Sequence, residues 1–433
     1  MAQIVHGGES GVWGLDMLLA RLLRGIIERG ELMLIDARGK RHCMGDRTRG
    51  PAVTMRLHDR RLHRRLVLNP RLYTGEAYMD GTLTIEGGTI YDFLDLVGMN
   101  TGLSPIGGWD GRLAQLQKLW RWAQQYNPIG RAQANVAHHY DLSGELYEMF
   151  LDSDRQYSCA YFEGPDCTLE AAQAAKKRHI AAKLALQPGM RVLDIGSGWG
   201  GMALYLARTA DVHVTGITLS AEQHRLSQQR AIAEGLEDRV QFVMRDYREE
   251  TGTYDRIVSV GMFEHVGVPH YRTFFRRVNE LLTDDGVALL HTISHMDPPT
   301  STNPWLRKYI FPGGYCPSLS EILPYTEQLG LWVTDVEVLR LHYAETLRHW
   351  RARFVANWDK AAELYDERFC RMWEFYLAGS EMAFRHQGQM VAQIQMTKSV
   401  DTLPITRDYM TEWERANTPA RAGTEPRRLK SVR

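Results

Sequence analysis

The chain has 433 residues, of which 44% are hydrophobic and 24% charged, and its 52 basic residues balance 52 acidic ones. A length beyond roughly 250 to 300 residues favours two domains, and the balanced charge gives the whole molecule no electrostatic case for binding nucleic acid. Five scattered cysteines without CxxC spacing argue against a disulfide framework and against a zinc site. We recognise no signal segment, and no apolar run approaches the roughly 18 residues that span a bilayer, so we expect a cytoplasmic protein.

The first hundred residues predict a small α+β domain. Apolar residues recur at helical spacing over 15–29, and short strand-like segments follow at 32–36 and 53–57. This pattern ends near Leu96, and the Gly- and Pro-rich stretch at 101–111 is typical of a linker. We therefore divide the chain into an N-terminal domain at 1–100, a linker and connecting helix at 101–130, a larger domain at 131–400 and a C-terminal tail at 401–433.

Two short segments are strongly basic. One is His58 to Arg65, and the other is the end of the chain from Arg427. Each fits an anionic lipid surface, where a basic residue near the membrane contributes about 1 kcal/mol. Each also fits a solvated face or a tail without a partner, and the sequence leaves both interpretations open.

From Thr168 onward, helices alternate with short apolar strands. Ser220 stands at the start of one helix, with Gln223 three residues later in capping-box position. Continuous apolar strands separated by helices predict an α/β, Rossmann-like domain with a mostly parallel, doubly wound sheet. Ligands of such sheets bind beyond the carboxyl ends of the strands. We expect strands at 191–195, 212–217, 240–244, 254–260 and 287–293, and helices at 168–186, 200–209, 220–234 and 270–282.

The segment Val192 to Gly201 is a strand that runs into a Gly-rich turn. Gly196 and Gly198 permit a sharp turn and a close approach to a ligand. A dinucleotide site and a merely structural turn are the alternatives, but the spacing of the glycines departs from GxGxxG. Asp194 stands two residues before the first glycine, where S-adenosylmethionine (AdoMet) enzymes place an acidic residue near the methionine end. The turn resembles the first motif of those enzymes, the class I methyltransferases.

Polar residues follow the second and third strands. Asp246 and Tyr247 supply a carboxylate and a ring, which suit the adenine amino group and its face, although a turn residue beside a packed tyrosine is the alternative. The second strand ends in Gly216-Ile-Thr-Leu-Ser220 and lacks the acidic residue that normally holds the ribose hydroxyls.

After the fourth strand, Glu264 and His265 are expected at the mouth of the cofactor cleft, where they could handle a proton or hold a polar reactant. Asp297-Pro-Pro-Thr300 is similar to the DPP-aromatic motif of DNA amino-methyltransferases. It follows the fifth strand and ends in threonine, so we exclude a nucleic-acid substrate.

Seven segments together resemble the cyclopropane-fatty-acyl-phospholipid synthases and the related mycolic acid cyclopropane synthases. The N-terminal domain, with Gly75 to Gly81, also resembles that of the bacterial phospholipid enzymes and is missing from the mycolic acid enzymes, which favours a phospholipid substrate. The seven segments occur in the family's order, and they are 139–141, 157–162, the Gly-rich turn, 216–223, 263–267, 291–293 and 309–313.

The resemblance implies a cofactor, a reaction and a site. The double bond of an unsaturated phospholipid attacks the methyl group of AdoMet, and the resulting carbocation loses a proton as a cyclopropane ring closes. A bound bicarbonate is the implied base, held by Cys159, Glu264, His291, Ile293 through its backbone, and Tyr343. The residues implied to bind AdoMet are Tyr157, Ser158, Asp194, Gly196, Gly198, Thr218, Leu219, Gln223, Asp246, Tyr247 and His265.

We expect no metal, because the adjacent His138 and His139 have poor ligand spacing. A carbocation needs aromatic faces around it, and the candidates are Tyr161, Phe263, Tyr309 and Phe311. A helical stripe at 369–376 is either core or tunnel wall, and an insertion at about 300–330 could cover the acyl chain.

Three points stay open in the sequence. The product could instead be a methylene- or methyl-branched chain, or the protein could be a lipid-binding relative without turnover. The oligomeric state is not given, with a homodimer among the options. We expect the enzyme to visit the inner membrane face transiently, as a peripheral protein.

Overall fold

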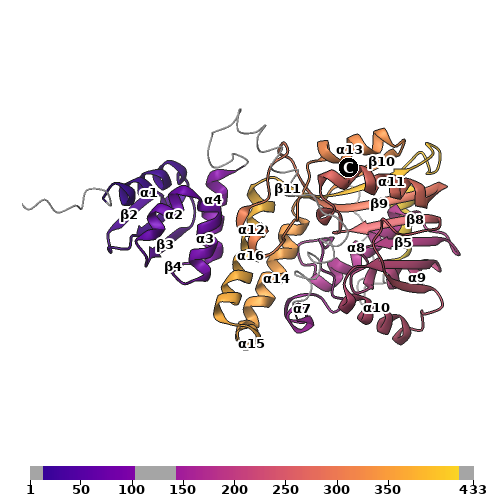
Figure 1. The fold of residues 1–433 in the computed structure, drawn as a ribbon, viewed down its shortest axis with the longest axis horizontal. Coiled ribbons are helices and arrows are strands. Elements are labelled where there is room, and N and C mark those ends of the chain that lie inside the picture. Colours follow the sequence, from indigo (N-terminus) through magenta and orange to yellow (C-terminus); the bar gives the residue numbers. More distant parts are fainter. Residues whose placement is uncertain (1–12, 103–142, 419–433) are drawn as a thin grey trace, which may run out of the picture.

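The computed structural model describes residues 13–102 and 143–418, which form two domains built on separate sheets (Figure 1). The linker proposed after residue 102, the segment at 139–141 and the chain from residue 419 lie outside the described residues. The small N-terminal domain has a four-stranded sheet in the order β2-β1-β3-β4, which confirms the predicted α+β unit. Its elements are α1 (Trp13–Ile26), β1 (Gly30–Ile35), β2 (Arg41–Asp46), β3 (Ala52–Leu57), α2 (Arg61–Leu68), α3 (Pro70–Met79), β4 (Leu83–Gly87) and α4 (Ile90–Thr101).

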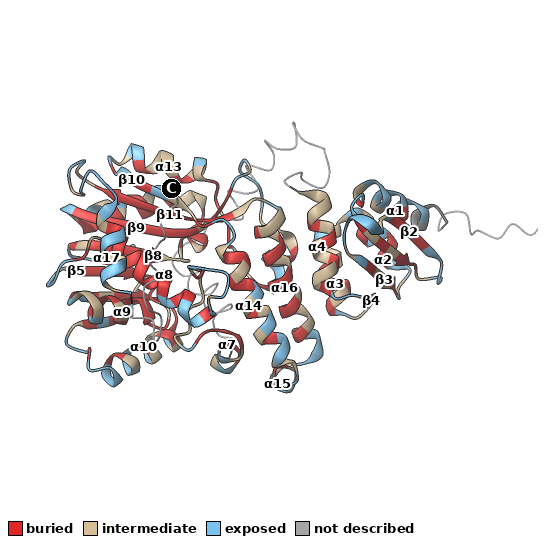
Figure 2. Ribbon diagram, turned by 180° about the vertical axis from the view of Figure 1, so that it is seen from behind, coloured by how far each residue is buried: buried red, intermediate tan, exposed pale blue. Residues whose placement is uncertain are grey.

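The larger domain has a seven-stranded sheet in the order β10-β11-β9-β8-β5-β6-β7, and β11 runs antiparallel to both of its neighbours. The other pairs are parallel, so the predicted, mostly parallel α/β sheet is confirmed. Most of its strand residues are buried (Figure 2), as expected for a sheet covered on both faces. The strands are β5 (Arg191–Ile195), β6 (His213–Thr218), β7 (Val240–Met244), β8 (Tyr254–Val260), β9 (Leu282–His295), β10 (Trp332–Val338) and β11 (Gln389–Thr397).

Helices cover this sheet and connect its strands. Within the segment expected to be a tail, residues 408–416 form α17, which packs against α8. The insertion at 300–330 contains two helices, α12 and α13. The helices of this domain are α7 (Gly144–Phe150), α8 (Leu169–Lys183), α9 (Gly201–Ala210), α10 (Ala221–Ala233), α11 (Tyr271–Leu281), α12 (Pro304–Tyr309), α13 (Leu319–Gln328), α14 (His342–Ala356), α15 (Trp358–Leu364), α16 (Glu367–His386) and α17 (Asp408–Ala416).

The predicted cap of α10 is only half formed. The hydroxyl of Ser220 accepts a hydrogen bond from the Gln223 N–H at 3.3 Å, as an N-cap residue should. The Gln223 side chain does not complete a capping box, because its amide oxygen instead accepts a hydrogen bond from the hydroxyl of Thr218 at 2.9 Å. This turns Gln223 toward the end of β6, where ligands of the sheet are expected.

The N-terminal domain packs on α16 through α3 and α4, and α12 packs on α3 (Figure 1). Tyr78 donates a hydrogen bond to Glu374 at 2.7 Å, and the ring of His386 lies 2.8 Å from Asp95. Gly75 lies so close to Trp305 that a Cβ atom there would be 2.5 Å from the indole nitrogen. The first helix of the insertion is therefore part of the domain interface.

Candidate active site

The Gly-rich turn connects β5 to α9 at the carboxyl edge of the sheet. Gly196 has a φ of 84°, in the left-handed region that favours glycine, and a Cβ atom there would be 2.8 Å from the side chain of Met262. The backbone N–H groups of Gly196 and Ser197 both donate to the carbonyl of Ile217 at 3.0 Å. The turn is thereby fastened to the end of β6, and a pocket opens beside it.

One pocket at this edge is lined by all eleven residues that the sequence assigned to AdoMet. They come from the segment before α8, from the ends of β5 and β6 and the turns that follow them, from the first turn of α10, from the loop after β7 and from the turn after β8. Several further lining residues were not predicted, although Trp199 lies inside the Gly-rich turn and Arg248 directly follows Asp246 and Tyr247. These additional residues include Arg155, Gln156, Trp199, Arg245, Arg248, Gly261 and Met262.

Asp194 is the buried carboxylate of this pocket. It is 1% exposed, and its Oδ2 atom has no hydrogen-bond partner within the described part of the chain. Burial raises the pKa of Asp194 to about 7, although the nearby Lys176 acts in the opposite direction. A buried acceptor without a partner suits a ligand that brings a positively charged donor, as the amino group of AdoMet does.

Asp246 differs from the expectation because it is already paired. The guanidinium of Arg248 donates to Oδ1 at 2.8 Å and to Oδ2 at 2.7 Å, and the Arg248 N–H donates to Oδ1 at 2.9 Å. A carboxylate has about four acceptor positions, so Asp246 retains capacity for one further donor such as an adenine amino group. At the end of β6, the neutral pair of Thr218 and Gln223 occupies the place where an acidic residue was missing.

The five residues implied to hold bicarbonate lie deeper, and none of them lines the cofactor pocket. Glu264 sits in a 3-10 turn after β8, and its Oε1 atom accepts a hydrogen bond from the N–H of Ile293 on β9 at 2.5 Å. Its Oε2 atom is buried without a hydrogen-bond partner among residues 13–102 and 143–418. Burial raises the pKa of Glu264, which favours its protonated form.

His291 lies on β9, one strand from Gln393, and its Nδ1 is 3.1 Å from the Gln393 amide nitrogen. Burial lowers the pKa of His291 to about 3, so the ring is neutral at neutral pH. Because the amide donates, Nδ1 is the acceptor and Nε2 carries the proton. An ionised Glu264 would repel a bound bicarbonate, and either a protonated Glu264 or a charged His291 would relieve this repulsion. Burial raises the pKa of Glu264 and lowers that of His291, so it favours the first and opposes the second.

Cys159 and Tyr343 belong to one buried apolar cluster, against which Ile293 also packs. The thiol of Cys159 donates to the carbonyl of Ala160 at 3.3 Å, and burial raises its pKa, so the group is a thiol rather than a thiolate. The Tyr343 ring lies 4.8 Å from that of Phe384. Glu264 is thus hydrogen-bonded to Ile293, and Ile293 packs against the apolar cluster that contains Cys159 and Tyr343.

The four aromatic candidates do not gather in one place. Phe311 lies beside the site, 6.3 Å from His265 and 5.7 Å from Tyr376 between ring centroids. Phe263 stacks on Tyr271 in the core under the sheet. Tyr161 and Tyr309 are also elsewhere: the first stacks between two histidine rings, and the second contacts the N-terminal domain.

The stripe on α16 is mainly core, because Trp373 and Tyr376 are buried and Phe369 and Met372 pack against the same cluster. Tyr376 also reaches the site, since its hydroxyl lies 2.8 Å from the hydroxyl of Tyr157 in the pocket wall.

The sheet order with its one reversed strand, together with the pocket at the Gly-rich turn, defines a class I AdoMet-dependent methyltransferase. The family model of mycolic acid cyclopropane synthetase matches residues 129–394, more than half of the chain. The chain belongs to this family.

Individual relatives agree with this assignment. Cyclopropane-fatty-acyl-phospholipid synthase of Escherichia coli (strain K12) is 44% identical over 263 residues, which cover 61% of this chain and 67% of the relative. Tuberculostearic acid methyltransferase UfaA1 of Mycobacterium tuberculosis is 42% identical over 268 residues, covering 59% and 62%. The solved structure of mycolic acid cyclopropane synthase CmaA1 with S-adenosylhomocysteine (SAH) and CTAB is 37% identical, with a TM-score of 0.59, and covers 63% of this chain and 99% of that one.

Proposed function

We propose that this methyltransferase adds a methylene unit from AdoMet to the cis double bond of an unsaturated phospholipid acyl chain. The methyl carbon leaves the sulfonium and bonds to one alkene carbon, the other alkene carbon becomes cationic, and loss of a proton from the new methyl group closes the cyclopropane. The products are the cyclopropane lipid, SAH and a proton on the base. One observation carries the proposal: the pocket lined by all eleven AdoMet candidates adjoins the buried side chains of Glu264 and His291.

The buried group fits a bicarbonate ion in its chemistry. The unpartnered Oε2 atom of Glu264, when ionised, would accept the O–H of bicarbonate, and when protonated would donate to it. The neutral ring of His291 and the hydroxyl of Tyr343 can donate hydrogen bonds to its oxygens. The Ile293 N–H is directed to Glu264, so bicarbonate would have to share this donor. Bound bicarbonate would supply the base for the final proton.

A surface of the N-terminal domain suits an anionic membrane. Helices α1 and α2 pack together, and both expose basic side chains. Helix α1 also exposes Met17, Leu18 and Leu22, while Leu62 and Leu66 of α2 face the core. Apolar and basic side chains side by side are the pattern of helices that lie in a membrane interface. The exposed basic residues of this docking surface are Arg21, Arg24, Arg60, Arg61, Arg64 and Arg65. Among the described residues, no helix has the length and apolarity needed to cross a bilayer.

A branched product is the second candidate, and the similarity to tuberculostearic acid methyltransferase UfaA1 favours it. Mass spectrometry of vesicles that contain an unsaturated phospholipid, incubated with the protein and AdoMet, separates the two. Cyclopropanation adds 14 mass units and removes the double bond, so the product resists ozonolysis. A methylene-branched product gains the same mass but is still cleaved by ozone. Unchanged lipids would refute both candidates.

A further inference from the structure

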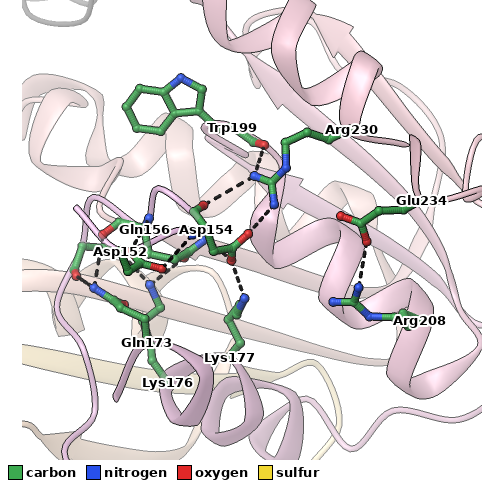
Figure 3. A network of polar contacts seen from close by, with 11 residues as sticks. Asp152, Asp154, Gln156, Gln173, Lys176, Lys177, Trp199, Arg208, Arg230 and Glu234 are labelled. Atoms are coloured by element: carbon green, nitrogen blue, oxygen red, sulfur yellow. Dashed lines mark hydrogen bonds and ion pairs between the residues drawn. The ribbon is translucent and has the colours of Figure 1, made fainter. Parts of the chain in front are cut away.

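Lys176 is a fully buried lysine behind the wall of the cofactor pocket. It lies on α8, has 0% exposure and does not line the pocket itself. Its ammonium group donates to the side-chain oxygen of Gln156 at 2.7 Å (Figure 3) and to the hydroxyl of Ser158 at 2.8 Å. Both acceptor residues line the pocket, so Lys176 contacts the pocket wall on the side that faces away from the cavity.

Residues 155–158 of the pocket wall belong to the segment 152–158, which is tied to the domain at several points (Figure 3). The Gln173 side chain, one turn before Lys176, donates to the carbonyls of Gln156 at 3.2 Å and Ser158 at 3.0 Å. Asp154 forms ion pairs with Lys177 on α8 and with Arg230 on α10. This wall segment is therefore held by hydrogen bonds and ion pairs rather than by regular secondary structure.

A second buried lysine on the same helix shows what is unusual about Lys176. Lys183 is also 0% exposed, and its ammonium group pairs directly with the carboxylates of Asp335 and Glu337. A buried charge is normally stabilised by such a carboxylate. Lys176 instead donates its hydrogen bonds to two neutral oxygens of the pocket wall, while the carboxylates of Asp152 and Asp154 favour its charge through electrostatic attraction. The ion pairs of Lys183 lie away from the cofactor pocket, whereas both hydrogen bonds of Lys176 go to residues that line it.

The charge of Lys176 also acts on Asp194. Burial lowers the pKa of Lys176 to about 8, which still leaves it mainly protonated at neutral pH. Its positive charge lowers the pKa of Asp194, against the rise that burial causes. The lysine therefore favours the ionised form of the carboxylate whose Oδ2 atom has no partner among the described residues.

We infer that Lys176 is a positioning residue for the methionine half of AdoMet: it fixes Ser158 and Gln156 in the wall of the pocket that also contains Asp194. This inference rests on the proposed assignment of Ser158 and Asp194 to AdoMet binding, with Asp194 near the methionine end. It does not depend on the lipid product.

The test compares two ligands by isothermal titration calorimetry of the full chain. SAH carries the methionine half, whereas 5′-methylthioadenosine has the adenosine and the sulfur but no amino or carboxyl group. Lys176→Met should weaken SAH binding at least tenfold and 5′-methylthioadenosine binding less than threefold. Lys183→Met is the matched control, since it removes an equally buried lysine of α8. It should lower the melting temperature but change neither affinity more than threefold.

Equal affinity of wild type and Lys176→Met for SAH would overturn the inference, and so would an equal loss for both ligands. If Lys176→Met does not fold, Ser158→Ala decides, because it removes an oxygen that Lys176 holds. Unchanged SAH binding in Ser158→Ala would overturn the inference, and a selective loss for SAH would support it. If the wild-type protein binds neither ligand, the proposed cofactor site itself is wrong, which is a different outcome.

Discussion

The carboxylate of Glu264 accepts a hydrogen bond from the backbone N–H of Ile293 at 2.5 Å, which links the turn after β8 to the adjacent strand β9. This bond fixes one carboxylate oxygen and leaves the other, Oε2, buried without a hydrogen-bond partner in the described ranges. The side chain is thus held at one atom and available at the other, which is the geometry expected of a group that orients a small reactant.

Replacing Glu264 with glutamine tests this geometry. The amide retains an oxygen for the Ile293 N–H and an NH₂ group that can donate as a protonated carboxyl would. Unlike the carboxyl group, however, it can neither accept a hydrogen bond nor give up or take up a proton at the position of Oε2. We expect product formation to fall at least about 100-fold, the lower range for loss of a proton-handling group. SAH affinity by calorimetry should stay within twofold, because Glu264 does not line the cofactor pocket. Normal turnover in Glu264→Gln would contradict its proposed role.

The contact between Tyr376 and Tyr157 predicts an effect on the cofactor from a residue outside its pocket. Tyr376→Phe removes a hydrogen bond of 2.8 Å between buried hydroxyls, which is worth about 1 kcal/mol. SAH binding should weaken about fivefold. Tyr365→Phe is the control, since that hydroxyl accepts a hydrogen bond from the Ser143 N–H. Equal SAH affinity for Tyr376→Phe and wild type would show that Tyr157 is held by packing alone.

His179 predicts a pH-dependent contribution to stability. Burial alone would lower the pKa of His179, but hydrogen bonds to Glu337 at 2.7 Å and Glu414 at 2.6 Å outweigh burial and raise it. A histidine whose folded pKa is raised stabilises the fold fully below its unfolded pKa of about 6.5, and this contribution is lost as pH rises through the folded value.

Wild type and His179→Asn should therefore differ most in acid. We expect a gap in the free energy of unfolding of about 3 kcal/mol at pH 6, typical of a broken buried charge pair, and a smaller gap at pH 9. Urea denaturation at the two pH values measures it. A gap that grows with pH would show that the ring is neutral in the folded state.

Gly75 provides a test of the domain interface. In Gly75→Val the new Cβ atom would lie 2.5 Å from the Trp305 indole nitrogen and 2.8 Å from the Phe375 ring, so the two domains must shift. Overpacking of this kind costs about 1 to 3 kcal/mol. We expect a lower melting temperature and faster proteolysis between the domains. Gly25→Ala on α1 is the control, because a Cβ atom there meets nothing within 4 Å. Identical melting temperatures of Gly75→Val and wild type would mean that the interface accommodates the larger side chain without a loss of stability.

The docking surface predicts salt-dependent binding to vesicles. Alanine at Arg60, Arg61, Arg64 and Arg65 should weaken binding to vesicles rich in anionic lipid about 100-fold or more at low salt, since each basic residue contributes about 1 kcal/mol. The difference should shrink as salt rises. An equal loss in a variant with the same change in charge on the larger domain would refute the surface. That control variant carries alanine at Arg208, Arg225, Arg272 and Arg276, which are also exposed.

Sequence patterns located the elements that carry strong local signals. The strands β5, β7 and β8 have the predicted bounds, because apolar runs between turn residues mark them on both sides. β10 was missed, since it is an edge strand with several exposed residues and has no continuous apolar run. β2 was missed because its burial alternates and half of its residues are polar or charged.

The residues of the site divide in a similar way. Asp194 and Gly196 belong to a local motif and could be recognised from spacing alone. The pairing of Asp246 with Arg248 depends on side-chain rotamers, which no spacing specifies. Lys176 belongs to no recognisable motif, and its position in the sequence is that of an ordinary helix residue. Only the tertiary structure shows that it is fully buried behind the pocket.

Helix α16 contacts two different parts of the protein through residues two positions apart. Glu374 accepts a hydrogen bond from Tyr78 of the N-terminal domain, and Tyr376 meets Tyr157 in the pocket wall. Residues two apart on a helix point about 200° away from each other, so the helix contacts the N-terminal domain on one side and the wall of the cofactor pocket on the other. A small rotation of α16 would move both contacts at once. A substitution that changes the domain interface therefore has to be checked for its effect on the cofactor pocket, and the reverse also holds.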